Sequence, residues 1–242
     1  NTPGKVAIFS TCYVNYNEPG IGQDLGRILE HNEIPARIVE KEACCGMPKL
    51  ELGDLEAVAG LKEKNIPLLA SLAREGYAIV TPVPSCTLMF KQELPLMFPD
   101  DPDVIKVRDA IYDPFEYLML RHKAGKLNTD FEKSLGKIAY QVPCHLRVQN
   151  IGLKTRDLLQ LVPDTEVEAI ERCSGHDGTY AVKKETHEIS RKIARPVVSR
   201  VKKSEAQHFI SDCPMAAEQI AQGLDDQAAG NPMSLLRTAY GI

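Results

Sequence analysis

The stretch "RIVEKEACCG", residues 37–46, runs from apolar residues into two adjacent cysteines and a glycine. Adjacent thiols rarely pair in a disulfide, because the ring that they would close is small and strained. Cys44 and Cys45 are better suited to bind metal, provided that other cysteines reach the same place. The chain has seven cysteines, an odd number spread over its whole length, so a complete disulfide framework is excluded.

The chain repeats this pattern, which is its strongest signal. The first half contains "KVAIFSTC" (5–12), "RIVEKEACCG" (37–46) and "YAIVTPVPSCTLM" (77–89), and the second contains "KIAYQVPC" (137–144), "EVEAIERCSG" (166–175) and "AQHFISDCPMA" (206–216). In each half an apolar strand ends in Cys, a second ends in Cys-Cys-Gly or Cys-Ser-Gly, and a third ends in Cys. The intervals between corresponding cysteines are also similar, so we interpret the chain as a tandem repeat.

Helical patterns fill the intervals between the predicted strands. We expect helices in "IGQDLGRILEHN" (21–32), "GLKTRDLLQLV" (152–162) and "ETHEISRKIARPVVSRV" (185–201). The last of these carries Ile189, Ile193 and Val197 at four-residue steps, with Pro196 as a candidate kink. Strands that alternate with helices predict parallel sheets joined by right-handed crossovers.

We therefore predict an α/β fold of two tandem Rossmann-like halves, each with a parallel sheet, related by a pseudo-twofold axis. The first half is expected over 1–98, a helical connector over 99–135, and the second half with a C-terminal tail over 136–242. The connector is rich in Asp and Pro at its start and has a helical pattern through "PFEYLMLRHKAG" (114–125).

All cysteines follow the predicted carboxyl ends of strands, which meet at one edge of a parallel sheet. Residues distant in sequence should therefore converge there, and the helices that start at this edge favour an anionic, thiolate-rich centre. Gly46 leaves room for the backbone to turn behind such a centre. The predicted first site is Cys12, Cys44, Cys45 and Cys86, and the predicted second site is Cys144, Cys173 and Cys213.

Four thiolates can hold an iron–sulfur cluster or zinc. Structural zinc sites usually contain Cys-x2-Cys pairs, and this chain has none. Adjacent cysteines suit one cluster with several metal atoms, so we expect one or two iron–sulfur clusters of the 4Fe-4S type. Zinc at one site, in a structural subunit of a redox complex, is the alternative. Buried structural cysteines would not explain seven thiols on matched strand ends.

The doubled pattern of Cys, Cys-Cys-Gly and Cys resembles the cysteine-rich CCG domain family, which includes the B subunit of heterodisulfide reductase. "SCTLM" (85–89), "VPCHL" (142–146) and "DCPMA" (212–216) look most like the branch of the anaerobic glycerol-3-phosphate dehydrogenase C subunit. The resemblance implies an oxidoreductase subunit that passes electrons between a dehydrogenase or ferredoxin-like donor and a quinone or disulfide-type acceptor. It also implies a cytoplasmic location, with peripheral attachment at the inner membrane through a partner. An upstream ferredoxin-like segment would fit a chain that begins at Asn1 rather than Met.

The sequence departs from that family in three places. The full family motif carries five cysteines in each half and ends in Cys-x-x-Cys, but Met89 and Ala216 occupy the last positions here. Ser174 stands where the second of the paired cysteines would be. These changes put the noncubane four-iron cluster of heterodisulfide reductase, and thiol–disulfide chemistry, in doubt.

The second site therefore needs a ligand other than cysteine, or an open iron. His176 lies two residues beyond Ser174, and His145 lies beside Cys144. Either could serve as a ligand or as a hydrogen-bond donor, and imidazole in place of thiolate raises a reduction potential. We treat the other four histidines as structural: His31, His122, His187 and His208. Haem is conceivable, but no motif selects it.

Composition excludes several other classes of protein. The formal net charge of −4 gives no basic footprint for nucleic acid, and no apolar run is long enough to span a bilayer. "PGIGQDLG" (19–26) approaches a dinucleotide-binding fingerprint, but its glycines begin too far from the first strand, so we take Gly20 and Gly22 as loop glycines. A nucleotide-dependent enzyme is thus a weak alternative, and no catalytic acid, base or nucleophile stands out.

Overall fold

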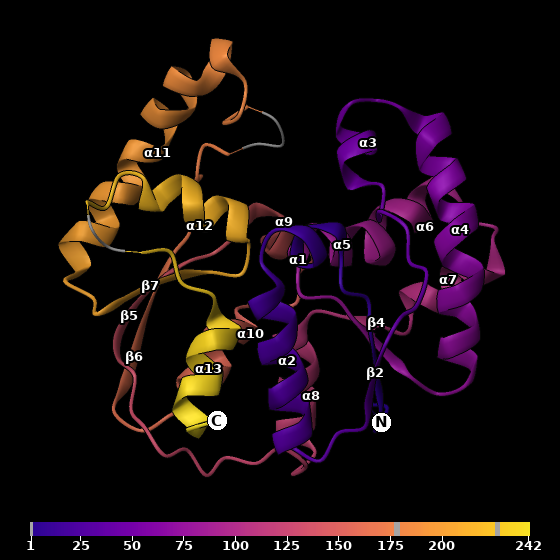
Figure 1. Cartoon of the computed structure of the whole chain (residues 1–242), viewed down its shortest axis with the longest axis horizontal. Helices are drawn as coiled ribbons and strands as arrows, with labels where there is room; N and C mark the ends of the chain where they lie inside the picture. Colours follow the sequence, from indigo (N-terminus) through magenta and orange to yellow (C-terminus); the bar gives the residue numbers. More distant parts are fainter. Residues whose placement is uncertain (1, 177–179, 226–227) are drawn as a thin grey trace. The chain divides into compact units, whose positions relative to one another are not determined.

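The computed structural model describes residues 2–176, 180–225 and 228–242 (Figure 1). Contacts divide the chain into two compact units, one ending at Asn128 and the other covering Thr129–Ile242. The first unit contains β1 (Val6–Ile8), α1 (Cys12–Tyr16), α2 (Pro19–His31), β2 (Ala36–Ile38), α3 (Met47–Glu51), α4 (Leu55–Arg74), β3 (Ala78–Val80), α5 (Pro84–Leu88), the π-helix η1 (Met89–Glu93), α6 (Leu94–Met97), α7 (Pro102–Arg108), β4 (Ile111–Tyr112) and α8 (Pro114–Lys123). The second unit contains β5 (Gly136–Gln141), α9 (Cys144–Arg147), α10 (Lys154–Leu159), β6 (Thr165–Ile170), α11 (Lys184–Ser204), β7 (His208–Ser211), α12 (Pro214–Ala221) and α13 (Pro232–Tyr240).

Each unit has its own parallel sheet, and the strand order repeats. The first sheet has the order β2-β1-β3-β4 and the second has the order β6-β5-β7 (Figure 1). In both, the first strand of the repeat is central and pairs in parallel with the second and third strands. The prediction of an α/β fold with two separate parallel sheets is confirmed.

The strands and helices form where the apolar patterns predict them. The three residues of β1 are all buried, as are those of β3, which is typical of parallel strands that are covered on both faces. In α2 the predicted apolar face, Ile21, Leu25, Ile28 and Leu29, is buried. Ile21 of α2 belongs to the same buried hydrophobic cluster as Ala7 of β1 and Ile79 of β3, so this helix packs in the core of the first unit.

Most of the segment expected to be a connector packs within the first unit. β4 pairs in parallel with β3 through Ile79–Ile111 and Val80–Tyr112 and adds a fourth strand that the sequence analysis did not predict. The helix expected over 114–125 is α8. It begins at Pro114 with a capping box between Asp113 and Glu116.

One expectation about local structure was wrong. Gly20 and Gly22 are not loop glycines, because they lie in the first turns of α2, where an added Cβ on Gly22 would stand 3.0 Å from Val14. The three apolar residues at four-residue steps on α11 differ in burial, because Val197 alone is buried. Ile189 and Ile193 are 47% and 41% exposed, and the helix packs instead through a face made of Ser190, Ala194, Val197, Val201 and Ser204.

Candidate metal centres

The cysteines lie where strands end and short helices begin. Cys12 is the first residue of α1 and Cys144 the first residue of α9. Cys86 lies within α5, and Cys213 is the N-cap of α12. Gly46 caps α3 in the left-handed conformation, with φ of 101°. Parallel strands bring these turns to one edge of each sheet, as the sequence analysis predicted.

The structure brings the four thiols of the first unit together. Cys12 contacts Cys44, Cys44 contacts Cys45, and Cys45 contacts Cys86, each through a hydrogen bond between side chains. Hydrogen bonds from Cys12 and Cys45 lower the pKa of Cys44, whereas the same contacts raise the pKa of Cys12 and of Cys45. Cys45 and Cys86 are buried and Cys12 is exposed, so the cluster of thiols reaches from the core to the surface.

Glu42 ties the loop of Cys12 to the loop of Cys44. Its two carboxylate oxygens accept hydrogen bonds from the backbone N–H groups of Ser10 and Thr11, both at 2.9 Å, and one also accepts from Asn15 Nδ2 at 3.1 Å. Burial raises the pKa of Glu42 to about 7, and the three donors oppose that rise. Thr11 has φ of 75°, which is strained for a β-branched residue. Glu42 therefore holds a strained turn immediately before Cys12.

Asn65 of α4 holds the other side of the same loop. Its side chain is 1% exposed and accepts a hydrogen bond from the Ala43 N–H at 2.9 Å. It also donates to the carbonyl oxygens of Ala43 and Cys44, at 3.3 and 3.0 Å. The sequence analysis missed this residue. The sequence feature that could have revealed it is an amide residue at helical spacing from Val58 and Leu69, on the buried face of α4.

The second unit places its thiols less closely. Cys144 and Cys213 are near enough to interact electrostatically, and burial raises the pKa of Cys213 to about 11. Cys173 is exposed in the loop after β6, and its Sγ accepts a hydrogen bond from the Gly175 N–H at 3.3 Å. Glu171, at the position that corresponds to Glu42, instead forms an ion pair with Arg147 at 3.0 Å.

Cys-Ser-Gly has the same local structure as Cys-Cys-Gly. Gly175 is left-handed, with φ of 77°, like Gly46. Cys45 accepts a hydrogen bond from the backbone of Met47, two residues ahead, and Ser174 Oγ accepts one from the N–H of His176, also two residues ahead, at 3.3 Å. Ser174 is buried. It therefore takes the structural place of the missing thiol.

A chain of buried hydrogen bonds fixes the Cys-Ser-Gly loop. Ser190 Oγ, on α11, donates to the Gly175 carbonyl at 2.6 Å, and Gln219 Nε2, on α12, donates to Ser190 Oγ at 2.7 Å. A Cβ on Gly175 would stand 2.4 Å from the Ser190 carbonyl oxygen, so only glycine fits there. This loop consequently has little freedom to move relative to α11.

Gln141, at the end of β5, connects the three strand ends of the second unit. Its Nε2 donates to the Arg172 carbonyl at 3.1 Å, and its Oε1 accepts from Ser211 Oγ at 2.8 Å. Ser211 Oγ accepts in turn from the Cys213 N–H at 3.3 Å. The sequence analysis did not single out any of the polar residues that support the two sites: Glu42, Asn65, Gln141, Ser190, Ser211 and Gln219.

A buried carboxyl group lies beside Cys213. Asp212 accepts hydrogen bonds from Tyr140 Oη and, at 2.7 Å, from Thr155 Oγ1. Burial raises the pKa of Asp212 to about 6. The corresponding position before Cys86 in the first unit is Ser85, so the two thiol sites differ in the charge next to their third cysteine.

The histidines lie as follows. His176 is half-buried directly after the Cys-Ser-Gly loop, and His145 is the second residue of α9, beside Cys144. The four histidines expected to be structural lie in α2, α8, α11 and β7, in keeping with the helices and strands predicted there: His31, His122, His187 and His208. In α11, His187 Nδ1 lies 2.8 Å from the Ala181 carbonyl oxygen.

Comparison with known families identifies the repeat. The model of the cysteine-rich domain named CCG matches this chain twice, over residues 6–91 and 138–220. The chain belongs to the cysteine-rich CCG domain family. The first match contains β1, β2 and β3 but not β4, the second contains most of β5 and all of β6 and β7, and each contains the strand-end cysteines of its unit. The two CCG matches coincide with the two copies of the cysteine pattern in the sequence.

Three curated relatives of this CCG chain are informative. It is 27% identical over 97% of its length to the C subunit of anaerobic glycerol-3-phosphate dehydrogenase of Escherichia coli (strain K12), and covers 59% of that protein. It is 25% identical over 93% of its length to an uncharacterized iron–sulfur protein of Methanococcus maripaludis, of which it covers 42%. It is 31% identical over 86% of its length to lactate utilization protein A 2 of Bacillus mycoides, of which it covers 87%. The chain thus spans between about two fifths and three fifths of the first two relatives.

The arrangement of the CCG thiols bears on which metal centre they fit. Among the residues that the structure describes, no group of three or more His, Cys, Asp or Glu side chains is arranged to hold one metal ion. In the first unit, however, four thiols from three strand ends form a continuous series of contacts. A cluster with several iron atoms needs thiols at several points, whereas zinc needs four ligands around one point. The donor set therefore fits a cluster.

The helices of this CCG chain do not meet the requirements of a membrane span. Across 2–176, 180–225 and 228–242, no helix is both long and apolar enough to cross a bilayer.

Proposed function

We propose that this chain is an iron–sulfur subunit of an oxidoreductase and transfers electrons between a donor and an acceptor. The observation that supports this most directly is the contact of four thiols, Cys12, Cys44, Cys45 and Cys86, at the carboxyl edge of the first sheet. In this proposal the four thiolates bind a 4Fe-4S-type cluster. The bound cluster would accept and release single electrons, and Glu42 and Asn65 would hold the loops that carry its ligands.

Substitution of Cys45 tests this ligand set. Cys45→Ser removes one thiolate from a buried position, so we expect iron and sulfide per protein to fall by about half or more, because ligand binding and folding are coupled in such sites. Met89→Leu is the matched control, since Met89 packs behind Gly46 and the change conserves volume. Unchanged iron and sulfide in Cys45→Ser would refute the ligand assignment.

Zinc in a structural subunit is the second candidate. Anaerobically purified protein should be brown and contain iron and acid-labile sulfide if the proposal is right. A colourless protein with zinc and no sulfide would favour the zinc alternative. The lack of an arrangement for one metal ion among the described residues argues against zinc.

We further propose that the second unit holds a different centre, at Cys144, Cys173 and Cys213, with His176 or His145 as the fourth group. Ser174 is a poorer candidate for that role, because its hydroxyl would have to bind as an alkoxide, which is uncommon. Fewer thiolates stabilise the oxidised metal less, so this centre should have the higher reduction potential of the two.

Electron paramagnetic resonance during an anaerobic redox titration tests the second centre. His176→Ala and His145→Ala should each be compared with His187→Ala, a helix histidine outside the thiol sites. The variant that removes the fourth group should shift the midpoint of one signal and leave the other in place. Two identical centres, or no shift in either variant, would mean that neither histidine contributes.

The donor and acceptor are inferred from the relatives. The name of the Escherichia coli relative, the C subunit of an anaerobic glycerol-3-phosphate dehydrogenase, suggests that the organic substrate is oxidised on a partner subunit. We propose that electrons pass from such a dehydrogenase, or from a ferredoxin-like protein or segment, to a quinone or disulfide-type acceptor. In this proposal the chain works in the cytoplasm and reaches the inner membrane through a partner.

A further inference from the structure

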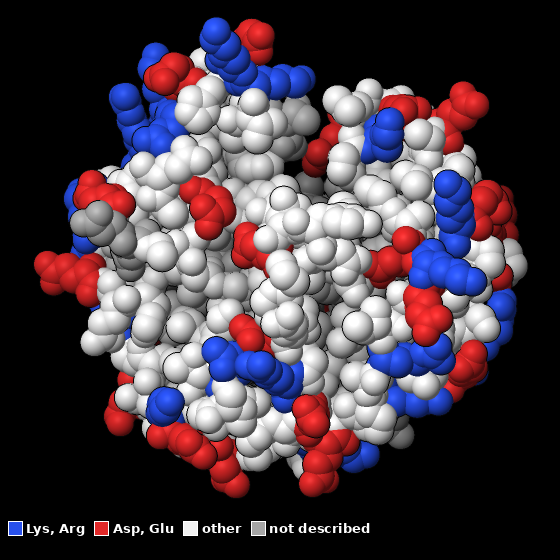
Figure 2. All heavy atoms as spheres, in the orientation of Figure 1, with Lys and Arg blue, Asp and Glu red and all other residues white. Residues whose placement is uncertain are grey.

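Positive charge is concentrated on one helix of the second unit. The whole chain has a formal net charge of −4, yet α11 contains seven Lys and Arg residues and only two Glu, a formal charge of +5. Figure 2 shows these basic side chains gathered over α11, at the upper left. Such a local excess in an acidic chain would attract an anionic partner.

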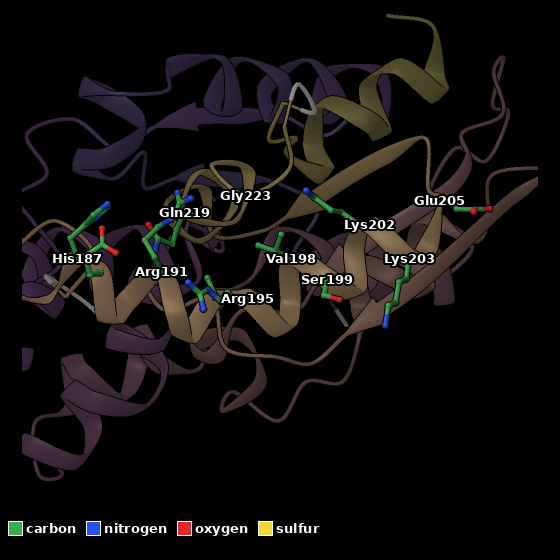
Figure 3. Close-up of a pocket in the computed structure, with 12 residues that line it drawn as sticks. His187, Arg191, Arg195, Val198, Ser199, Lys202, Lys203, Glu205, Gln219 and Gly223 are labelled. Carbon is green, nitrogen blue, oxygen red and sulfur yellow. The ribbon is translucent and has the colours of Figure 1, made fainter.

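Part of this charge lines a groove between α11 and α12 with a volume of about 880 Å³. Figure 3 shows His187, Arg191 and Arg195 in succession along α11, followed by Lys202 and Lys203, and the lining also includes Glu188 and Glu205. Between four and five helical turns separate His187 from Lys203, a length of roughly 24 Å at 1.5 Å per residue. We call the groove lined by this row the basic groove.

Two of the cations in the basic groove make no direct polar contact with the described residues. Among the described residues, Arg195 and Lys203 form no hydrogen bond or ion pair, and both are exposed. By contrast, Arg191 donates to Gln222 and Lys202 forms an ion pair with Asp225 at 2.8 Å. Arg195 and Lys203 are therefore available to an external anion.

The floor of the groove is joined to the second thiol site. Gln219 lines the groove and is the first member of the hydrogen-bonded series that continues through Ser190 to Gly175. The N–H of Gly175 donates to Cys173 Sγ. A molecule in the basic groove would thus lie one helix away from the loop that carries Cys173.

We infer that the basic groove is the docking site for the electron-transfer partner of the second centre, and that the partner is a protein that presents a row of carboxylates. This inference rests on the proposed function. In the transfer, the reduced partner would give up one electron and be oxidised, and the second centre would accept that electron and be reduced. The same surface would serve transfer in the reverse direction. The carboxylates would steer the encounter and set its orientation.

The geometry favours this occupant over two others. A small anion needs cations that converge on a point, whereas these follow four turns of one helix. A membrane-bound helix inserts apolar side chains beside its basic ones, but the exposed Ile189 and Ile193 lie about 120° and 160° around α11 from Arg195, and about ten or more residues along it from Lys203. An elongated acidic protein surface matches both the length and the charge of the basic groove.

The test measures electron transfer into the whole, anaerobically purified chain by stopped-flow absorbance. The probe is a reduced plant-type [2Fe–2S] ferredoxin with an acidic surface. We expect Arg195→Glu/Lys203→Glu to slow its second-order reaction about tenfold at low salt, and high salt to reduce the difference. The control is Lys64→Glu/Lys106→Glu, which makes the same charge change at exposed sites of the first unit and should alter the rate less than twofold.

Reduced methyl viologen, a small cation, separates the inference from the proposed function. It should reduce wild type and both double variants at rates within twofold of one another. Failure to reduce wild type would refute the redox function itself.

Three results would overturn the docking site. One is that ferredoxin reacts equally slowly with both double variants, or that neither variant reacts more slowly than wild type. A second result would also overturn it: wild type sediments with phosphatidylserine vesicles, Arg195→Glu/Lys203→Glu does not, and the two react with ferredoxin at the same rate. The groove would then bind membrane. Competition by inorganic phosphate at equal ionic strength would indicate a small-anion site and would also overturn it.

Discussion

Cys45 and Ser174 show how one residue can change chemistry while the local structure stays the same. Both side chains accept a hydrogen bond from the backbone two residues ahead, and both are followed by a left-handed glycine. The backbone of the loop does not depend on whether the side chain is a thiol or a hydroxyl. The number of thiolates does depend on it, so the substitution affects the metal site more than the fold.

Gly175 provides a prediction at this scale. Gly175→Ala combines a left-handed backbone with a clash against the Ser190 carbonyl, whereas Gly125→Ala has a similar φ of 66° and open space around it. We expect Gly125→Ala to lower the free energy of unfolding by about 1 kcal/mol and Gly175→Ala to lower it by at least about 2 kcal/mol more. Urea denaturation measures both, and equal losses would show that the loop can move away from α11.

At the scale of secondary structure, short helices carry the thiols and long helices hold them in place. α1, α5 and α9 are too short to be stable alone, so their conformation depends on the sheet edge from which they start. The long helices α4 and α11 reach into the cysteine loops through Asn65 and Ser190. Each site is therefore held by a helix that does not itself contain a ligand.

Ser190 allows this role to be tested on α11. Ser190→Ala leaves the Gly175 carbonyl and the Gln219 amide without their partner, and should lower the free energy of unfolding by about 1–3 kcal/mol. The Gly175 N–H should exchange faster with deuterium, and the midpoint potential of the second centre should shift while that of the first does not. Ser199→Ala, on the exposed side of α11, is the control and should change none of these. If Ser190→Ala matched that control, α11 would not position the loop.

At the scale of the whole molecule, each unit builds the same arrangement from its own repeat. The central strand carries one cysteine, and its two neighbours carry the others, so three distant stretches meet at one edge. The first unit adds β4 and gathers four thiols, while the second has three thiols and a buried Asp212. We therefore expect the two units to depend on metal to different extents.

Anaerobic removal of iron with a chelator tests that difference. Without iron, ionised thiols at the first site should repel one another. The free energy of unfolding of the first unit should therefore fall by about 3 kcal/mol or more. Hydrogen–deuterium exchange should rise over 40–50 and 84–93 more than over 142–148 and 171–176. Equal changes in both units, or protection that persists at 40–50 after iron is lost, would contradict this expectation.

The sequence by itself determined the repeat, the parallel strands and the thiols at their carboxyl ends. These follow from local apolar runs and from Cys positions that recur along the chain, and the CCG match confirms the family. The helices over 21–32 and 114–125 were also predictable, because their apolar residues or caps are local signals. The cysteines of each predicted site could be proposed for the same reason, because each one follows the carboxyl end of a strand that the sequence itself marks.

Only the tertiary structure decided which other residues hold those sites. Glu42, Asn65 and Ser190 act on backbone groups that are distant in sequence, or belong to another element, and no periodicity marks such contacts. The buried face of α11 was likewise decided by packing: both of its sides carry small or apolar residues, and contact with the sheet and with Gly175 buries Ser190 and Ala194 while it leaves Ile189 exposed. Hydrophobicity favours burial of any apolar side chain, but only the close fit of neighbouring elements selects which one is buried.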